Sequence, residues 1–492
     1  MCPGCAKVVA PVGRSRYRSQ ESGDQSRVSR IDETGLAKLA RKMREEELPE
    51  IATRAFLRAV EFVAAGGATT ISDRDIGPVD GLRRLADLGE FEAAGRAAAA
   101  RVAVIKLNGG LGTSMGLSKA KSLLPIRPGL TFLDSIAQQV LWQRDTWGVE
   151  LPLVLMNSYR TRDESLEALA RYPQLAGAVP LDFLQHKVPR IDAESWAPVE
   201  WPADDSLAWC PPGHGDLYIA LASSGMLDAL RDRGIRYVFI SNADNLGATL
   251  DLEILGWIAA KQVPFLMEVA ERTEADKKGG HLARRDGRLI LREVAQCPEA
   301  DLDGFQDISK YGYFNTNNIW LDLDVLALAL EASPEGLPLA VICNEKPVDP
   351  RDPSSPRCYQ LETAMGSAIE YFEGAEALVV PRERFAPVKT TNDLLELWSD
   401  AFELAADARM LPSDAEAKRA RVIDLDPRYF GRIDELQARF PQGAPSLARC
   451  QRFTVCGDHR FGAKVVLEGV VELRNDSATQ VRIESGTRLS GK

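Results

Sequence analysis

Two spacings of apolar residues alternate along most of the chain. Continuous apolar runs, typical of buried strands, occur at 102–107, 151–158, 237–245, 265–272 and, running on into a helix, 311–326. Segments with apolar residues three or four positions apart, which predict amphipathic helices, lie between them at 131–144, 164–172 and 251–262. Alternating strands and helices are typical of a mostly parallel sheet covered by helices. The pattern therefore predicts an α/β core over residues 101–400.

The N-terminal end departs from this pattern. Residues 1–30 are rich in Ser, Arg, Gly and Gln and show no hydrophobic period, which predicts a disordered tail. Residues 31–100 show helical spacing instead, first near Leu36, then over 52–65 and again over 81–101. We therefore expect a tail followed by a helical segment in front of the core.

The C-terminal end, residues 401–492, also differs from the core. A helix is predicted over 393–408, at the junction. From 453 onward, short apolar alternations are punctuated by glycine, which predicts short stacked strands with tight turns. A small β-helix and a small sandwich both fit this spacing.

Composition narrows the class of partner. The formal net charge of −11 at pH 7 argues against a general nucleic-acid-binding face, while a local group of lysines can still hold a small anion. No apolar run approaches the ~18 residues of a membrane-spanning helix, and the N-terminus lacks the apolar core of a secretory signal. Among eight cysteines, Cys2 and Cys5 form the only CxxC, and no second pair completes a zinc site. We expect a cytoplasmic protein with reduced thiols and no membrane or nucleic-acid partner.

The stretch VIKLNGGLGTSMGLSKAKS (104–122) holds four glycines within eight residues. A dinucleotide-binding G-x-G-x-x-G needs its third glycine one place earlier than Gly116, and a P-loop needs a lysine where Leu117 stands. A third kind of site fits. A strand opens into a loop whose backbone N–H groups approach a nucleotide, and the charge of Lys121 follows. The loop therefore predicts a phosphate-binding site of nucleotidyltransferase type.

Further segments surround this loop in sequence. They are MNSYRT (156–161), FLQHKVPRI (183–191), PPGHGDLY (211–218), SNADNLGAT (241–249), KKGGHLAR (277–284), FNTNNIWLDL (314–323), QLETAMGSAIEYF (360–372) and VPRERFAPVKTTNDLL (380–395). Together with the glycine loop they resemble the eukaryotic-type UTP–glucose-1-phosphate uridylyltransferases (UDP-glucose pyrophosphorylases) over about residues 101–400. The resemblance implies a Rossmann-like, GT-A-like nucleotidyltransferase core with a mixed sheet, and a left-handed β-helix-like C-terminal domain. Ala120 replaces the proline expected in close relatives, which leaves open whether Lys119 also reaches phosphate.

The implied reaction converts UTP and glucose 1-phosphate to UDP-glucose and pyrophosphate with Mg²⁺ as cofactor. A sugar phosphate oxygen attacks the α-phosphorus in line, with no covalent enzyme intermediate. Because the attacking phosphate is already anionic near neutral pH, no protein base is required, and the obstacle is the crowding of negative charge. Lysines, Mg²⁺ and backbone donors meet that demand, and few histidines are expected. This sequence fits, with lysines, a glycine loop and only four histidines.

Roles for single residues follow from the matched segments. Lys121 is expected to hold the triphosphate, and Lys389, read as a strand end facing a pocket, the phosphates of both substrates. Asp244 ends a buried strand, where carboxylates face the ligand crevice, and is assigned to Mg²⁺; Asn242 is assigned to the ribose or α-phosphate side. The other nucleotide candidates are Leu107, Gly109, Gly110, Gly112, Thr113, Gln185 (whose amide matches the imide edge of uracil), Gly213 and His214. The sugar candidates are Gly280, Asn315, Asn317 and Glu362.

Other functions stay open at this stage. Within the enzyme class, a UDP-N-acetylhexosamine or broad-specificity UDP-sugar pyrophosphorylase shares the loop. A nucleotide-sugar-binding protein without activity is disfavoured by the presence of both Lys121 and Lys389. A glycosyltransferase would use an Asp-x-Asp metal string, and the nearest match, Asp322-Leu-Asp324, falls in a segment predicted to enter a helix. The C-terminal strands offer a surface for homo-oligomer formation or a simple cap, and the sequence does not decide between them.

Overall fold

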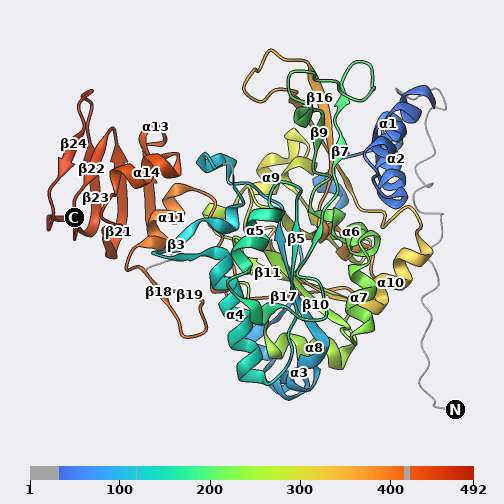
Figure 1. Ribbon diagram of the computed structural model, residues 1–492, viewed down its shortest axis with the longest axis horizontal. Coiled ribbons are helices and arrows are strands. Elements are labelled where there is room, and N and C mark those ends of the chain that lie inside the picture. The colour runs from blue at the N-terminus through green and yellow to red at the C-terminus, as the bar shows by residue number, and fades with distance from the viewer. Residues whose placement is uncertain (1–30, 32, 118, 415–420, 492) are drawn as a thin grey trace.

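The computed structural model describes residues 31, 33–117, 119–414 and 421–491 (Figure 1). The predicted disordered tail and the Cys2–Cys5 pair lie outside this part of the chain. Within it, no helix combines the length and the apolar character needed to cross a bilayer.

A mixed sheet forms the centre of the molecule. Its strands are, in spatial order, β1 (Arg83–Arg84), β17 (Glu376–Val379), β11 (Phe265–Glu271), β14 (Tyr313–Asp322), β10 (Tyr237–Asn242), β2 (Val102–Asn108), β5 (Leu153–Asn157) and β6 (Asp182–Leu184). All neighbouring pairs along this path are parallel except those of β14, which runs antiparallel to β10 and β11. A hairpin of β12 (His281–Arg285) and β13 (Arg288–Arg292) is attached to β14. The predicted α/β core with a mixed sheet is confirmed.

Helices cover both faces of this sheet, because its central strands are apolar on both sides. Val102 and Val104 of β2 point into one hydrophobic core, and Ala103 and Ile105 point into a second. The first core is closed by α3 (Glu92–Ala98), α4 (Phe132–Trp147) and α8 (Leu252–Lys261). The second is closed by α6 (Leu217–Ser223), α7 (Met226–Asp232) and α10 (Leu323–Ala332). Alternation of side chains along a strand thus explains the three layers.

The N-terminal helices form a separate packing unit. Helices α1 (Glu33–Glu45) and α2 (Glu50–Ala64) share a hydrophobic cluster with a small sheet of β15 (Val341–Pro347), β16 (Arg357–Thr363) and β8 (Ile191–Asp192). The prediction of a helix over 81–101 is wrong in its first half. There β1 pairs with the edge strand β17, and only α3 with flanking 3₁₀ turns is helical.

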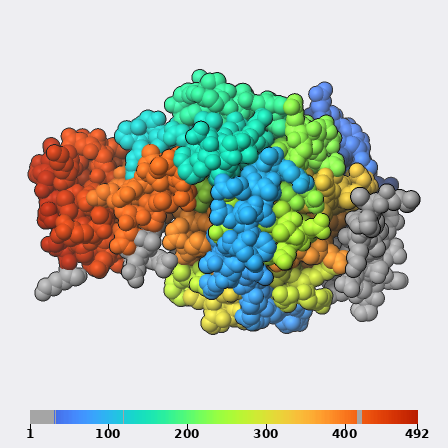
Figure 2. Space-filling model, turned by 90° about the horizontal axis from the view of Figure 1, so that it is seen from below, coloured from blue at the N-terminus to red at the C-terminus, as the bar shows by residue number. Residues whose placement is uncertain are grey.

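The C-terminal part stands at one end of the molecule, away from the N-terminal helices (Figures 1 and 2). The predicted helix over 393–408 is wrong beyond Trp398. Helix α11 covers Thr391–Trp398, and a hairpin of β18 (Phe402–Leu404) and β19 (Met410–Pro412) follows it. The Phe402 side chain is buried in the first core, so tertiary packing overrides the alanine-rich helical pattern.

The last strands stack in parallel. One sheet contains β20 (Val422–Leu425), β21 (Ser446–Cys456), β23 (Val466–Arg474) and β25 (Arg488–Ser490), and a second pairs β22 (His459–Phe461) with β24 (Val481–Ile483). From β21 onward, consecutive strands alternate between the two sheets, as in a β-helix. The short helices α13 (Pro427–Phe430) and α14 (Ile433–Arg439) lie between β20 and β21 in the sequence. The β-helix alternative is therefore confirmed over the sandwich, and its left hand stays a prediction.

Candidate functional site

Strands β2 and β10 run parallel and end side by side, with Leu107 opposite Asn242. The backbone N–H of Ala243 donates to the Leu107 carbonyl at 3.1 Å, which holds the turn after β10 against the start of the glycine loop. In open α/β sheets, the carboxyl ends of parallel strands border the ligand crevice. The glycine loop and the SNADN segment therefore meet at the edge where a ligand is expected.

The glycine loop folds back on itself. The Lys121 N–H donates to the Gly110 carbonyl at 3.1 Å, and the Gly112 N–H donates to the Lys119 carbonyl at 3.4 Å. A β-carbon at Gly110 would have no heavy atom within 4 Å, so its backbone faces open space. The side chains of Thr113 and Lys119 are exposed, and within the described residues no hydrogen bond or ion pair joins them to the other predicted site residues.

The predicted base-recognition residues are in direct contact. The Gln185 amide packs against Gly109, where an added β-carbon would lie 2.6 Å from Gln185 Oε1. The Gln185 N–H donates to the carbonyl of Asn157, at the end of β5, at 2.8 Å. Glycine at position 109 therefore leaves room for the amide beside the loop backbone.

Lys121 and Asp244 form an ion pair. The Lys121 Nζ lies 2.5 Å from Asp244 Oδ2, and the two side chains are 19% and 18% exposed. The structure therefore joins the residue predicted to hold phosphate and the residue predicted to hold the metal.

The surroundings of Asp244 fit a divalent cation. Its Oδ1 atom is buried and has no hydrogen-bond partner among the described residues. In that part of the chain, no group of three or more His, Cys, Asp or Glu side chains is arranged to hold a metal ion. Mg²⁺ is commonly bound by one or two carboxylates together with substrate phosphate oxygens, so a single carboxylate with a free oxygen suits it.

Lys389 lies next to this pair, although not on a strand end as predicted. The Val388 N–H donates to the Asp244 carbonyl at 3.4 Å, which places the segment against the SNADN turn. Lys389 is exposed and precedes α11, and its own N–H donates to Asp393 Oδ2 at 2.9 Å. Pro387 has no N–H to continue a strand ladder, so the chain turns into the helix cap instead.

Gly213 and His214 contact the segment that carries Glu362. A β-carbon at Gly213 would lie 2.4 Å from the Thr363 carbonyl oxygen and 3.1 Å from the Glu362 β-carbon. The His214 Nδ1 accepts a hydrogen bond from the Met365 N–H at 2.9 Å, and burial lowers the pKa of His214 to about 4. The ring is therefore neutral at pH 7, and its Nε2–H is the donor left for a ligand.

Three of the four predicted sugar residues, Gly280, Asn315 and Asn317, gather around a bulge in β14. The Asn315 N–H donates to the Gly280 carbonyl at 3.1 Å. The Asn315 Nδ2 donates to Asn317 Oδ1 at 2.8 Å, and the Asn317 N–H donates back to Asn315 Oδ1 at 2.9 Å. Asn317 has a φ of 58° at the point where the pairing with β11 shifts register. The bulge therefore presents two amides beside Gly280.

Glu293 was not predicted and lies in the same region. Its carboxylate packs against Gly280, where an added β-carbon would be 2.4 Å from Glu293 Oε2. Burial raises the pKa of Glu293, and the charge of Lys389 opposes that shift. Glu293 therefore lies beside Gly280 and feels the charge of Lys389. In the sequence, a glutamate in LREVAQ resembles any surface charge, and no local signal distinguishes it.

A buried polar network below the loop was also missed. The Lys106 Nζ, inside an apolar strand, donates to Ser241 Oγ at 2.7 Å and to the Ala248 carbonyl at 2.8 Å. Burial, together with the charge of Arg384, lowers the pKa of Lys106 to about 7. Arg384 itself makes a buried ion pair with Glu268 and donates to the Thr249 carbonyl at 2.9 Å. These side chains fix the floor of the turn that carries Asp244. In the sequence, the signal for this network was Lys106 itself, a charged residue within the apolar run 102–107.

Known proteins show the same combination of sequence and fold. The family model described as UTP–glucose-1-phosphate uridylyltransferase matches residues 54–468. The UTP–glucose-1-phosphate uridylyltransferase of Solanum tuberosum is 37% identical over 425 residues, 86% of each chain, and that of Hordeum vulgare is 39% identical over 394 residues, 80% of this chain and 81% of the relative.

Solved structures agree. A UDP-glucose pyrophosphorylase mutant from Leishmania major in complex with UDP-glucose has a TM-score of 0.87 and 42% identity, over 94% of this chain and 99% of that one. A Trypanosoma brucei structure described as a UDP-glucose phosphorylase has a TM-score of 0.84 and 43% identity, over 93% of this chain and 99% of that one. The chain therefore belongs to the UTP–glucose-1-phosphate uridylyltransferase family of nucleotidyltransferases.

Proposed function

We propose that this protein makes UDP-glucose and pyrophosphate from UTP and glucose 1-phosphate. The observation that carries the proposal is the Lys121–Asp244 ion pair, with the Lys389 segment bonded to Asp244, at the carboxyl ends of β2 and β10. The proposal is also supported by relatives named for this activity and by a structural neighbour whose complex contains UDP-glucose.

The proposed reaction is a single in-line displacement. An oxygen of the glucose 1-phosphate phosphate group forms a bond to the α-phosphorus of UTP, and the bond from that phosphorus to pyrophosphate breaks. The attacking group is already anionic, so these side chains contribute position and charge rather than proton transfer. Lys121 would face the triphosphate, and Lys389 would neutralise both phosphates as they approach each other.

Mg²⁺ fits this scheme as the cofactor. Asp244 would hold it, with substrate phosphates completing its coordination, and the bound ion would offset the charge that develops on the leaving pyrophosphate. Gln185, Gly109 and Gly110 would recognise uracil, while Gly280, Asn315 and Glu293 would surround the sugar. The Gly213–His214 loop would join the uracil side, and it contacts the segment of Glu362, a further candidate for the sugar.

Pyrophosphate release tests the proposal. UTP and Mg²⁺ are incubated in parallel with glucose 1-phosphate, galactose 1-phosphate and N-acetylglucosamine 1-phosphate. Release with glucose 1-phosphate alone is the expected result. Release only with another sugar phosphate would keep the reaction and overturn the substrate, and no release with any of them would overturn the activity.

The absence of a covalent intermediate is tested separately. A single displacement inverts configuration at the α-phosphorus, whereas a uridylyl-enzyme intermediate gives two inversions and net retention. Turnover of UTP carrying sulfur at the α-phosphate is expected to give inverted product. Net retention would contradict direct attack.

Assembly through the C-terminal stack also remains a proposal. Strand β25 (Arg488–Ser490) is the last strand of the stack in the described part of the chain, and it lies at one end of its sheet. Light scattering of the full chain, compared with a chain that ends before Arg488, checks whether this edge mediates homo-oligomer formation.

A further inference from the structure

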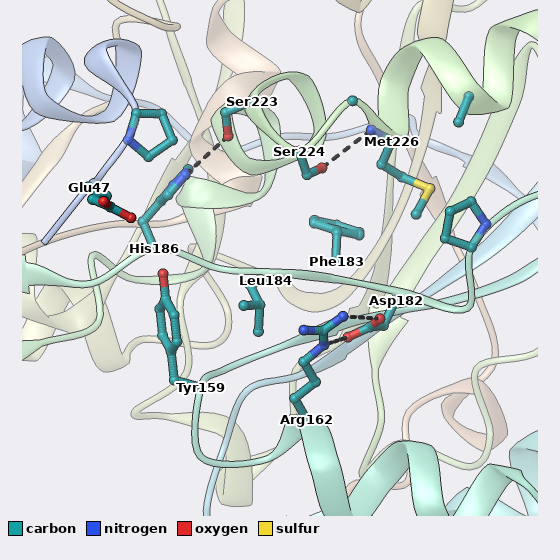
Figure 3. Close-up of a pocket in the computed structure, with 14 residues that line it drawn as sticks. Glu47, Tyr159, Arg162, Asp182, Phe183, Leu184, His186, Ser223, Ser224 and Met226 are labelled. Atoms are coloured by element: carbon teal, nitrogen blue, oxygen red, sulfur yellow. Dashed lines mark hydrogen bonds and ion pairs between the residues drawn. The ribbon is translucent and has the colours of Figure 1, made fainter.

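A cavity of about 410 Å³ lies beside the segment that carries Gln185 (Figure 3). Leu184 and His186 line the cavity, while the Gln185 amide between them packs against Gly109 of the nucleotide loop. Neighbouring side chains of an extended segment point to opposite sides. This short segment therefore separates the cavity from the proposed uracil site.

His186 is fixed by one carboxylate through two contacts. The backbone N–H of His186 donates to Asp216 Oδ2 at 2.7 Å, and the His186 Nδ1 lies 2.8 Å from Asp216 Oδ1. His186 and Asp216 are only 6% and 5% exposed. Because a carboxylate oxygen accepts, Nδ1 carries a proton, and Nε2 lies 3.1 Å from Ser223 Oγ on the cavity wall (Figure 3). We refer to the two contacts between His186 and Asp216 as the clamp.

The clamp joins two segments that both carry predicted nucleotide residues. His186 follows Gln185 directly, and Asp216 comes two residues after His214. The second segment is itself held to the sugar side, through Gly213 against Thr363 and through the hydrogen bond from Met365 to His214. The contacts of the Asp216 side chain with His186 therefore tie the Gln185 segment to the Gly213–His214 loop.

We propose that the His186–Asp216 clamp positions Gln185 for uracil recognition. This inference rests on the proposed function, because it concerns the base of UTP. Among the described residues, no hydrogen bond or ion pair joins His186 to Gly109, Lys121 or Asp244, so it acts through the backbone that it restrains. Hydrogen bonds to a charged, buried acceptor are among the stronger ones, which gives the clamp the stiffness that this role needs.

Ser223, His186 and Asp216 also lie in the order of a hydrolase triad. A nucleophilic serine needs nearby N–H groups free to bind a developing oxyanion. Here the N–H groups that follow Ser223 are already used. Those of Ser224 and Gly225 donate to the Ala220 and Ala222 carbonyls, each at 3.1 Å. The geometry therefore points to a positioning role and not to acyl transfer.

The test compares His186→Ala with His186→Asn, in which the amide replaces the Nδ1–H donor. H186A is expected to raise KM for UTP about tenfold, with KM for glucose 1-phosphate within about twofold and kcat within about threefold. H186N is expected to return KM for UTP to within about threefold of the wild type. Tyr159→Phe changes a 55%-exposed side chain on the same cavity wall and serves as the control with unchanged constants.

Binding of UTP by calorimetry, without glucose 1-phosphate, separates the clamp from the reaction. Wild-type turnover tests the proposed function, and the ratio of variant to wild-type UTP affinity tests the clamp. If H186A folds poorly, judged by its unfolding midpoint, Asp216→Asn provides the same readout with the side-chain volume kept. Unchanged UTP affinity in H186A and D216N, or a loss in H186N equal to that in H186A, would overturn the proposal.

Discussion

Lys121 and Asp244 lie 123 positions apart in the sequence, and their side chains meet at 2.5 Å between the glycine loop and the turn after β10. Each group neutralises the other while the site holds no substrate. When a triphosphate and a cation enter, the lysine and the carboxylate are each offered a partner of opposite charge. The pair therefore places the proposed triphosphate-binding and cation-binding groups side by side, and mutating each residue separately distinguishes the two functions.

Lys121→Met is expected to lower turnover by a factor of 10²–10³, because a charge that faces the reacting phosphates is lost. The neighbouring Lys119 is exposed and shares only a backbone hydrogen bond with the loop. Lys119→Met should therefore cost less than about tenfold. Steady-state rates at saturating substrates check the pair, and equal losses in both variants would contradict the assignment to Lys121.

Asp244→Asn is expected to raise the Mg²⁺ concentration needed for half-maximal rate by about tenfold or more, because a carboxylate with an unpartnered oxygen is replaced by a weaker neutral ligand. The measurement is a Mg²⁺ titration of pyrophosphate release at fixed UTP. A lower maximal rate with an unchanged Mg²⁺ midpoint would show that Asp244 serves only to orient Lys121.

Alanine substitutions at the adjacent residues Gly109 and Gly110 are expected to differ in their effects on UTP binding and stability. At Gly109 a methyl group would collide with the Gln185 amide at 2.6 Å, whereas at Gly110 it would enter open space. Gly109→Ala is expected to weaken UTP binding by displacing Gln185, with a small loss of thermal stability. Gly110→Ala should leave stability unchanged and weaken UTP binding only if the nucleotide occupies that space. Calorimetry with UTP and thermal unfolding of both variants check this.

His281 predicts how stability depends on pH. It is fully buried and stacks on Tyr311, with ring centroids 4.0 Å apart. Burial, together with the charges of Arg272 and Arg292, lowers the pKa of His281 to about 3. The unfolded chain, with a histidine pKa near ~6.5, binds more protons than the folded chain between these values, so stability falls as pH falls through that window.

His281→Phe keeps the stacked ring and removes the titration. Between pH 7.5 and 5, the wild type should lose about 2 kcal/mol more than this variant in free energy of unfolding. Urea unfolding at the two pH values measures the difference. At pH 7.5 the variant should be close to the wild type, since it loses only the 3.3 Å contact of His281 Nδ1 with the Leu282 carbonyl, and His281 Nε2 has no partner among the described residues. Parallel losses in both proteins would contradict a buried, neutral His281.

The sequence predicted the core well where burial is complete. The run at 237–245 contains β10, and the run at 102–107 covers all of β2 except its last residue, because strands apolar on both faces leave an unambiguous pattern. It failed over 81–101 and 393–408, where helix-forming composition gives way to edge pairing and to burial of Phe402. Local propensity contains no information about such partners.

The candidate site shows the same division. Lys121 and Asp244, both picked out by recognisable segments, lie in contact, while the roles assigned to them stay predictions. Glu293 was missed because an isolated glutamate looks the same in sequence whether it is solvated or buried, whereas Lys106 was missed although its place inside an apolar run was a usable signal. The connection through His186 depends on a partner 30 residues away, which no spacing rule could have supplied.

The bulge in β14 has a consequence for insertions and deletions. Along a strand, each residue step exchanges the two faces, so an extra residue changes which face every later side chain occupies. Between the pairs Glu268–Asn318 and Val269–Asn315, β14 carries two residues that β11 does not match, Thr316 and Asn317. Deleting Thr316 alone would leave one unmatched residue, and Asn315 would then change face relative to Trp320. A loop of the same composition would tolerate that deletion, whereas here one residue sets the phase between the sugar side of the strand and its buried end.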